Sequence, residues 1–285
     1  MLIVTGANGH LGGDIVRSLS TRRPLGRVVG SVRDPGKAAD LVDLGVEVRH
    51  GDFAEPETLE TAFAGATEVL IVSADKLGDE ARALHRAAID AARAAGARRI
   101  LYTSHMGARP NSPFAPAAQH WETERDLDSS GVSFTSLRNG FYAESCLHMI
   151  GDGLKRGELR VPADGPVSWT ARADLAEADA AILASGGEWD GITPPLTATA
   201  AVTMAEIAAM ASEVLGHEVR HTVLSDEDWV NERISAGIPA IYAEMLVGTF
   251  RAARNGDFAA TDTTLARLLG RDPVPMRDVL AGAAL

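Results

Sequence analysis

Three glycines after the first hydrophobic run constrain the fold more than any other feature of this chain. Residues 2–4 are a short run typical of a strand buried on both faces, and the sequence TGANGHLGG follows at once. In this context Gly6 would allow a tight turn, Gly9 a close approach of the backbone to a pyrophosphate, and Gly12 close packing of helix on strand. A plain glycine-rich turn is the alternative. The position between a strand and a helix favours dinucleotide binding.

The first half of the chain alternates between strand-like and helix-like segments. Strand patterns cover residues 2–4, 27–33, 46–53, 68–74, 98–104 and 132–138, and helical spacing is found in the segments between them. Six strands with intervening helices predict an α/β fold with a doubly wound parallel sheet of the Rossmann type. We therefore expect residues 1–150 to form an NAD(P)-binding Rossmann domain.

The pattern changes beyond residue 150. A short strand at 158–162, a helix at 203–216 and several helices between residues 225 and 269 predict a smaller, mostly helical lobe over residues 151–285. We expect this lobe to cap the substrate, with parts of residues 167–200 returning to the sheet. Prolines at 110, 113 and 116 predict a stiff surface loop over residues 106–118, followed by a helix at 119–127.

The acidic composition and the single cysteine exclude several classes of function. The 285 residues carry a net charge of -12, so the chain lacks the basic field that nucleic acids require. Cys146 is the only cysteine, which excludes an intramolecular disulfide and a cysteine-rich metal site. No apolar run approaches the ~20 residues of a membrane span, and glycine interrupts the start of the chain before a signal peptide could form. We expect a cytoplasmic monomer or homodimer that binds a small molecule, without nucleic-acid or membrane partners.

The end of the second predicted strand decides which dinucleotide is favoured. An acidic residue there would bind a ribose 2′-hydroxyl, whereas arginine would accept a 2′-phosphate. Arg33 is followed by Asp34 and Lys37, and two cations close to the predicted ribose favour NADP(H) over NAD(H). A solvated surface pair is the alternative, and Asp34 could still serve NAD.

One motif looks like a metal site and is not expected to be one. Residues 217–221 read HEVRH, which matches the zinc-protease pattern in which both histidines share one face of a helix. Gly216 stands where the preceding helix should end, and the residues after it look extended. In a strand the two histidines would lie ~13 Å apart, too far to share one ion. We expect no metal.

An absent motif bears on the chemistry. Classical short-chain dehydrogenases use Tyr-x-x-x-Lys, whose lysine lowers the pKa of the tyrosine that donates the proton. The chain has no such pair, because the residues four places after its three tyrosines are Met106, Cys146 and Leu246. Carbonyl reduction by that apparatus is therefore not expected. Hydride acceptors that need little acid assistance, such as quinones or cationic dyes, remain open.

Polar and aromatic residues at other predicted strand ends complete the candidate site. Asp52 and Phe53 could border adenine, Ser73 lies where the middle of the cofactor would pass, and Thr103 and Ser104 follow on the next strand. His120 and Tyr142 are the candidate catalytic residues, since histidine titrates near neutrality and could relay a proton. A flat apolar pocket could be formed by Met106, Phe114, Asn139, Phe141, Tyr142 and Trp169. An ordinary helix cap or core position is the alternative for each of these residues.

The chain resembles the NmrA-like group of atypical short-chain dehydrogenases/reductases. Within that group it is similar to the NADPH-dependent quinone oxidoreductase and triphenylmethane reductase branch. The segments that carry the resemblance are TGANGHLG, SVRDPGKAADL, GDF, LYTS, HWETERDLDSSGVSFTSLRNGFYAES and LARLLGRDPVPMRDVL, which together span nearly the whole chain.

The resemblance implies a function and roles for individual residues. It implies an NAD(P)H-dependent reductase of a quinone or another flat aromatic acceptor. Arg33 would meet the 2′-phosphate, Asp52 and Phe53 would border adenine, and Ser73, Thr103 and His120 would line the nicotinamide side. The residues implied to wrap the pyrophosphate are Gly6, Asn8, Gly9, His10, Leu11 and Gly12.

Two other functions remain open within the same resemblance. His120 stands where related benzylic-ether and isoflavone reductases carry a lysine base, which weakens any acid/base mechanism. A non-catalytic redox sensor of the dinucleotide, like the NmrA regulator, is one alternative. A tailoring enzyme that acts on a polycyclic aromatic metabolite with bound nicotinamide is the other.

Overall fold

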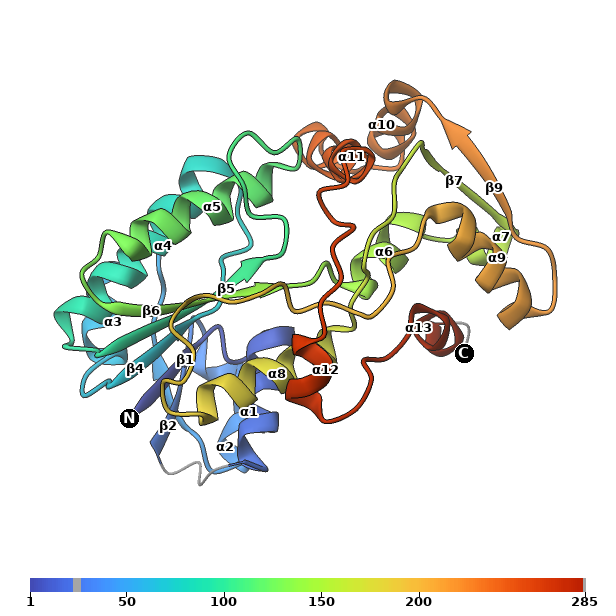
Figure 1. Ribbon diagram of the computed structural model, residues 1–285. Helices are drawn as coiled ribbons and strands as arrows, with labels where there is room; N and C mark the ends of the chain where they lie inside the picture. The colour runs from blue at the N-terminus through green and yellow to red at the C-terminus, as the bar shows by residue number, and fades with distance from the viewer. Residues whose placement is uncertain (23–26, 284–285) are drawn as a thin grey trace.

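A parallel seven-stranded sheet forms the centre of the larger lobe in the computed structural model, which describes residues 1–22 and 27–283 (Figure 1). The strand order is β3-β2-β1-β4-β5-β6-β8, and every pair is parallel. The strands are β1 (Leu2–Thr5), β2 (Val28–Val32), β3 (Glu47–His50), β4 (Glu68–Ile71), β5 (Arg99–His105), β6 (Ser133–Asn139) and β8 (Gly191–Ile192). The order reverses at β1, so the ligand crevice of a doubly wound fold lies at the carboxyl ends of β1 and β4. The predicted Rossmann-type sheet is confirmed.

Helices cover both faces of this sheet (Figure 1). One face carries α3 (Pro56–Ala62), α4 (Gly78–Ala94) and α5 (Ala115–Asp128), and the other carries α1 (His10–Ser20), α2 (Ala39–Asp43), α8 (Arg172–Ala184) and α12 (Thr264–Leu269), with the short 3-10 helix η2 (Pro35–Lys37) after β2. Alternate residues of β1 pack against the helices on opposite faces of the sheet. Leu2 and Val4 belong to the core under α1 and α8, whereas Ile3 belongs to the core under α3 and α4.

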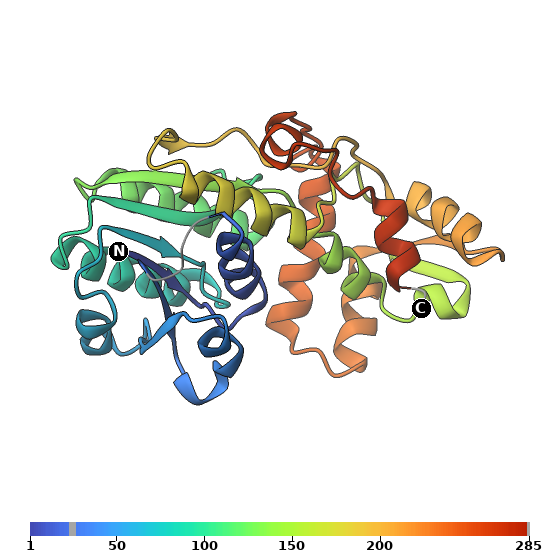
Figure 2. The same cartoon turned by 90° about the horizontal axis from the view of Figure 1, so that it is seen from below.

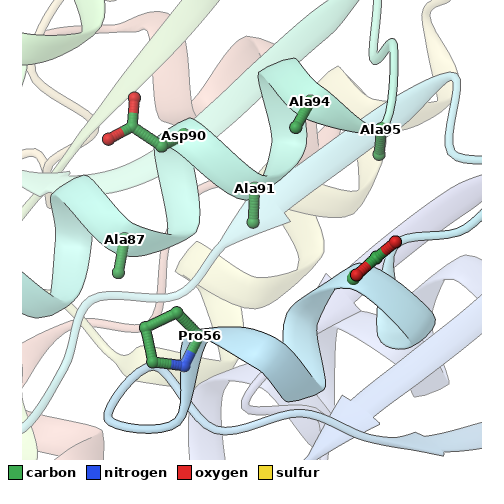
Figure 3. Close-up of a pocket in the computed structure, with 7 residues that line it drawn as sticks. Pro56, Ala87, Asp90, Ala91, Ala94 and Ala95 are labelled. Carbon is green, nitrogen blue, oxygen red and sulfur yellow. The ribbon is translucent and has the colours of Figure 1, made fainter.

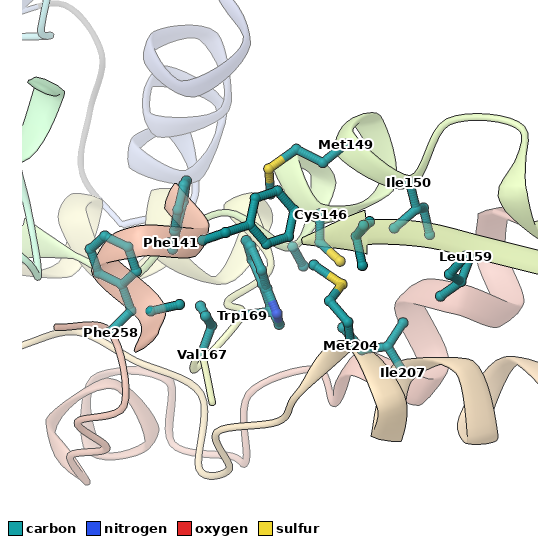
Figure 4. Packing of buried hydrophobic residues seen from close by; sticks show 14 of the residues in the cluster. Phe141, Cys146, Met149, Ile150, Leu159, Val167, Trp169, Met204, Ile207 and Phe258 are labelled. Carbon is teal, nitrogen blue, oxygen red and sulfur yellow. The ribbon is translucent and has the colours of Figure 1, made fainter. Parts of the chain in front are cut away.

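The second lobe is mostly helical and lies beside the sheet (Figure 2). It contains α6 (Ala143–Ile150), α7 (Gly153–Arg156), α9 (Met204–Leu215), α10 (Asp226–Ser235), α11 (Ala240–Arg254), α13 (Met276–Ala283) and a two-stranded parallel sheet of β7 (Glu158–Pro162) and β9 (Arg220–Leu224). Its core includes Phe141, Trp169, Met204 and Phe258, whose side chains are packed together in Figure 4. This lobe therefore has an apolar centre of its own.

The chain passes repeatedly between the two lobes. After β7 it returns to the sheet, where α8 packs against α1 and β8 pairs with β6. It then builds α9, β9, α10 and α11 in the second lobe. After α11 it crosses again as α12, which packs on α8, and ends as α13 against α6 and α9. The second lobe is thus assembled from several separate segments.

Several boundaries differ from those expected from the sequence, among them the end of β4, which lies at Ile71 and not at residue 74. Helix α5 begins at Ala115, four residues before the expected start, because Pro116 lies in its first turn, where a missing N–H costs nothing. The loop predicted over 106–118 is therefore wrong for its last residues. Strand β3 ends at His50 and not at residue 53. The sheet also gains β8, a two-residue strand with too short a pattern to be recognised.

The HEVRH segment has the conformation expected from the sequence. Gly216 ends α9 in the left-handed conformation, with φ of 70°, and β9 starts at Arg220. The two histidines of this segment therefore do not share a helix face. Over residues 1–22 and 27–283, no three His, Cys, Asp or Glu side chains are grouped closely enough to hold a metal ion. Within the same residues, no helix combines the length and the apolar character that crossing a membrane requires.

Candidate functional site

In the glycine-rich turn after β1, the backbone at residue 6 lies close to the backbone at residues 9 and 12. Gly6 has φ of 58°, in the left-handed region that favours glycine, and its carbonyl accepts a hydrogen bond of 2.9 Å from the amide of Gly9. A Cβ atom on Gly12 would lie 2.4 Å from the Gly6 carbonyl oxygen. The turn therefore requires glycine at 6 and at 12.

The helix that follows this turn leaves its first amides without side-chain partners. Gly9 is the N-cap of α1 and provides no side-chain cap, and the first turn of α1 contains no acidic residue. Thr203 and Ser225 cap α9 and α10, whereas α5, α6 and α11 resemble α1 in having no capping side chain. Free amides and the positive end of the helix dipole bind an anion well, so the turn fits the pyrophosphate of a dinucleotide.

The other residues predicted to meet the pyrophosphate divide between surface and core. Asn8 and His10 are exposed beside the turn, next to the free amides. Leu11 is buried and packs with the core under α1. Its side chain therefore anchors the helix, and only its backbone amide faces the turn.

At the end of β2, Arg33 is exposed and Asp34 is held by its own turn. The Asp34 carboxylate accepts a hydrogen bond of 3.0 Å from the Gly36 amide and lies 3.3 Å from the Lys37 ammonium. An aspartate bound in this way is poorly placed to accept from a ribose hydroxyl. Arg33 is therefore the charged side chain at this strand end that remains available to a ligand.

Asp52 and Phe53 lie half-buried directly after β3. The carboxylate of Asp52 accepts a hydrogen bond of 2.9 Å from the Ala54 amide, and the Asp52 amide donates to the Thr58 hydroxyl at 2.9 Å. Asp52 thus stabilises the turn that leads into α3. Its contact with adenine, and that of Phe53, stays a prediction.

Ser73 and Thr103 join the carboxyl ends of β4 and β5. The Ser73 amide donates to the Thr103 hydroxyl at 2.9 Å, and this hydroxyl donates to the Ser73 hydroxyl at 3.3 Å. The Val72 amide donates in the same way to the Thr5 hydroxyl of β1 at 2.9 Å. These bonds fix the edge of the sheet next to the glycine turn, where a cofactor would lie.

Ser104 faces away from that edge, into a buried ion pair. Its hydroxyl donates to Glu124 Oε1 at 2.8 Å, as does the hydroxyl of Ser136. The guanidinium of Arg138 donates to the same carboxylate, with Nη2 at 2.7 Å from Oε2. Side chains of a strand alternate between faces, which is why Ser104 and Thr103 point in opposite directions. The structure therefore places Ser104 in a network that links β5, β6 and α5.

A cleft of about 350 Å³ lies between the two lobes at this end of the sheet. The sheet lobe contributes Ala74 to Leu77 after β4 and the first turns of α5, with Gln119 and His120. The second lobe contributes side chains of α6 and α11. Apolar side chains that line the cleft are Phe114, Phe141, Met149, Tyr242, Met245 and Leu246. Charged and polar side chains line the rest of it, among them Asp75, Lys76, Glu144, His148 and Arg172. Its size and its apolar part suit a small aromatic ring system.

The structure brings only part of the predicted substrate pocket to this cleft. Of the predicted pocket residues, Phe114 and Phe141 line it, and so does the candidate catalytic residue His120. Met106 and Trp169 lie in the core of the second lobe, where Trp169 is 2% exposed (Figure 4). Neither of these two side chains lines the cleft.

Asn139 and Tyr142 also lie outside the lining of the cleft. The Asn139 amide donates to Asp179 of α8 at 2.9 Å, inside the protein. Tyr142 packs against the core under α8, and burial raises the pKa of its phenol. Neither side chain is therefore placed to touch an acceptor held in the cleft.

The α11 wall of the cleft was not found from the sequence. Tyr242, Met245, Leu246 and Thr249 line it and recur at the spacing of one helix face. This spacing could have identified a common face, but not what the face covers. Only the folded structure shows that this face of α11 covers the cleft.

A second hollow lies away from the glycine turn, between α3 and α4 (Figure 3). It has a volume of about 550 Å³ and is lined mainly by alanines of α4, with Pro56 and Glu60 of α3. Asp90 and Glu60 are its only ionisable groups, and none of the predicted site residues lines it. The smaller cleft between the lobes is therefore the candidate site.

A buried cluster of histidines and a tyrosine lies under the cleft. Tyr102 Oη is 2.7 Å from His120 Nδ1 and 3.4 Å from His85 Nδ1. His105 stacks on His120 with ring centroids 6.0 Å apart. Burial lowers the pKa of His85 and of His105 to about 4 and holds the pKa of His120 well below its ordinary value. All three histidines are therefore neutral at pH 7.

Comparison with known proteins agrees with this geometry. The model of the NmrA-like family matches residues 1–267. Quinone oxidoreductase 2 of Escherichia coli is 34% identical over 271 residues, covering 95% of this chain and 94% of the relative. The crystal structure of the NADPH-dependent quinone oxidoreductase of E. coli in complex with NADPH superposes with a TM-score of 0.93, at 33% identity and with 100% of each chain covered.

A second solved structure gives the same result. The triphenylmethane reductase of Citrobacter sp. in complex with NADP(H) has a TM-score of 0.90, at 32% identity, and 100% of each chain is covered. The glycine turn, the Rossmann-type strand order and the full-length matches together show that this chain belongs to the NmrA-like family.

Proposed function

We propose that this protein is an NADPH-dependent reductase that passes a hydride to a flat aromatic acceptor, a quinone in the first place. The observation that carries the proposal is the position of the apolar cleft, which lies next to the carboxyl ends of β4 and β5 and thus near the glycine turn. NADPH, when bound, supplies the hydride, and the protein supplies binding and orientation. The names of the relatives support this activity, since they include a quinone oxidoreductase and a triphenylmethane reductase.

Separate sets of residues would bind NADPH and the acceptor. The free amides of α1 would hold the pyrophosphate and Arg33 the 2′-phosphate, while Ser73 and Thr103 keep the sheet edge in place. Phe114, Phe141 and Met245 would hold the ring system of the acceptor. His120, which lines the cleft as a neutral imidazole, would offer an N–H group to the acceptor.

The activity is tested by following the oxidation of NADPH with a panel of acceptors. The panel contains benzoquinones, naphthoquinones and a cationic triphenylmethane dye, and calorimetry measures the affinity of NADPH separately. We expect saturable binding and turnover with at least one quinone. Tight binding of NADPH without turnover on any acceptor would contradict the proposal and favour a dinucleotide sensor.

Replacing Arg33 with alanine should weaken the binding of NADPH about 10-fold, which corresponds to about 1.4 kcal/mol. The binding of NADH should change less than 3-fold, because it carries no 2′-phosphate for Arg33 to meet. Lys37→Ala is the matched control. Lys37 is 78% exposed and already paired with Asp34, so its loss should have a smaller effect. Calorimetric titration with both coenzymes measures these changes, and equal losses for NADPH and NADH in Arg33→Ala would refute the assignment.

A further inference from the structure

A continuous set of hydrogen bonds runs from a backbone amide after β4 to the histidine in the cleft. The Ala74 amide donates to His85 Nε2 at 2.9 Å. His85 Nδ1 lies 3.0 Å from the Thr123 hydroxyl and 3.4 Å from Tyr102 Oη. Tyr102 Oη in turn lies 2.7 Å from His120 Nδ1. Tyr102 is fully buried.

The backbone amide fixes the tautomer of the first histidine. An amide N–H can only donate, so His85 Nε2 must be the unprotonated nitrogen. Since His85 is neutral, its proton lies on Nδ1 and points toward the two hydroxyl oxygens. The Thr123 hydroxyl donates its own hydrogen bond to the Gln119 carbonyl at 3.1 Å. His85 Nδ1 is therefore a donor and cannot accept a proton from Tyr102.

The tautomer of His120 follows from that of His85. Of the two nitrogens that Tyr102 Oη approaches, only His120 Nδ1 is free to accept the phenolic proton. Burial raises the pKa of Tyr102, so the phenol keeps its proton. A neutral His120 that accepts at Nδ1 carries its own proton on Nε2, the nitrogen left for the cleft that His120 lines.

We propose that His85 and Tyr102 hold His120 as an Nε2–H donor facing the cleft, and that this donor makes the enzyme favour acceptors with a carbonyl oxygen over cationic acceptors. His120 acts on the acceptor directly, whereas His85 and Tyr102 are positioning residues. The inference rests on the proposed function, because it concerns the choice of acceptor at the same site. A chain of hydrogen bonds also polarises its members, so the Tyr102 bond strengthens the Nε2–H donor.

The two kinds of acceptor differ in the charge that they develop. A quinone that takes up a hydride, which is two electrons and one proton, becomes a hydroquinone monoanion and then takes one proton from water. Negative charge grows on its oxygen, and a fixed N–H donor stabilises that charge. A cationic triphenylmethane dye takes the hydride at its central carbon and becomes neutral, with no further proton. The N–H donor has no growing anion to stabilise in that case.

The experiment compares the two acceptors in the same protein. The ratio of kcat/KM for a naphthoquinone to kcat/KM for a cationic triphenylmethane dye should fall about 100-fold in His120→Ala. The same ratio should fall about 10-fold in Tyr102→Phe, which removes only the hydroxyl group. Thr123→Val is the matched control, since it removes a hydroxyl from the same cluster but leaves the bond between Tyr102 and His120. Its ratio should stay within 2-fold of the wild-type value.

A measurement without coenzyme tests the tautomer itself. Nitrogen-15 NMR of the histidines should place the proton of His120 on Nε2 in the wild-type protein, and the Nδ1 resonance should shift in Tyr102→Phe when its hydrogen bond is lost. A proton on Nδ1 in the wild type would overturn the inference, as would an unchanged ratio of acceptors in His120→Ala and Tyr102→Phe. If the wild type reduces neither acceptor, the proposed function fails as well, which distinguishes the two failures.

Discussion

Replacing Gly12 with alanine should weaken the binding of NADPH at least 100-fold, or about 2.7 kcal/mol. The new Cβ would lie 2.4 Å from the Gly6 oxygen, 2.9 Å from the Gly6 carbonyl carbon and 3.2 Å from the Ala7 Cα atom. All three are backbone atoms, so no flexible side chain can move aside. The turn must open, and the first amides of α1 then lose their position around the pyrophosphate.

Gly13→Ala is the graded control for this prediction. Its Cβ would lie 3.2 Å from the Ala7 carbonyl oxygen, which requires a shift of only a few tenths of an ångström. We expect a much smaller loss of affinity, measured by calorimetric titration of both variants with NADPH. Circular dichroism checks that the two proteins remain folded. If Gly12→Ala bound NADPH within 3-fold of the wild type, the glycine turn would not be the pyrophosphate site.

Replacing Asp179 with asparagine should raise the free energy of unfolding at pH 8 by about 4 kcal/mol. Asp179 is fully buried in α8, and burial raises the pKa of its carboxyl to about 7. The folded protein therefore binds a proton more tightly than the unfolded chain, in which the pKa is about 3.9. The stabilisation from this proton is present at low pH and is lost as the pH rises from about 4 through 7.

The hydrogen bonds around Asp179 agree with a raised pKa of its carboxyl group. The Asn139 amide group donates to Asp179 Oδ2, while Asn139 Oδ1 and Asp179 Oδ1 are both buried without a partner. Two acceptors cannot satisfy each other, whereas a protonated acid or an asparagine amide supplies a donor. Urea unfolding of both proteins at pH 5 and pH 8 measures the effect, and the difference between them should fall to about 1.5 kcal/mol at pH 5. A difference that does not grow with pH would show that Asp179 is not protonated in the fold.

The sheet lobe could be predicted from the sequence because its signals are local. The strand before the glycine turn, the strand at 28–32 and the helix of residues 10–20 each have a pattern within a few consecutive residues. The cations after β2 could be placed for the same reason. A return of part of residues 167–200 to the sheet was expected, but the position of β8 was not, because two residues carry no periodicity. The early start of α5 was missed because a proline in the first turn of a helix resembles a loop.

The hydrogen-bonded cluster under the cleft depends on distant residues. His85, Tyr102 and His120 come from α4, β5 and α5, and only the packing of these elements brings them together. Some buried titratable residues do give a partial signal in the sequence. His85 lies at a position of α4 that shares its buried face with Ala88 and Ile89, and Asp179 lies among the buried residues of α8. A titratable group at such an apolar position can be seen in a sequence, but its partner cannot.

The same limit applies to the substrate pocket. Met106 and Trp169 are aromatic or sulfur-containing residues near the predicted site, and both are core residues of the second lobe. The residues that line the cleft in their place come from α6 and α11, which the chain reaches only after leaving the sheet. Residue type alone could not separate a pocket wall from a packed interior.

The repeated crossing of the chain between the lobes limits how the cleft can open. A wide hinge movement would have to bend the connections before α6, α8, α9, α12 and α13 at the same time, because each of them links the two lobes. We therefore expect entry of an acceptor to rely on local rearrangement at the α11 wall, where Tyr242 lines the cleft and is 42% exposed. Five crossings thus restrain separation of the lobes, and we expect exchange of ligands to depend more on the side chains of α11 that line the cleft.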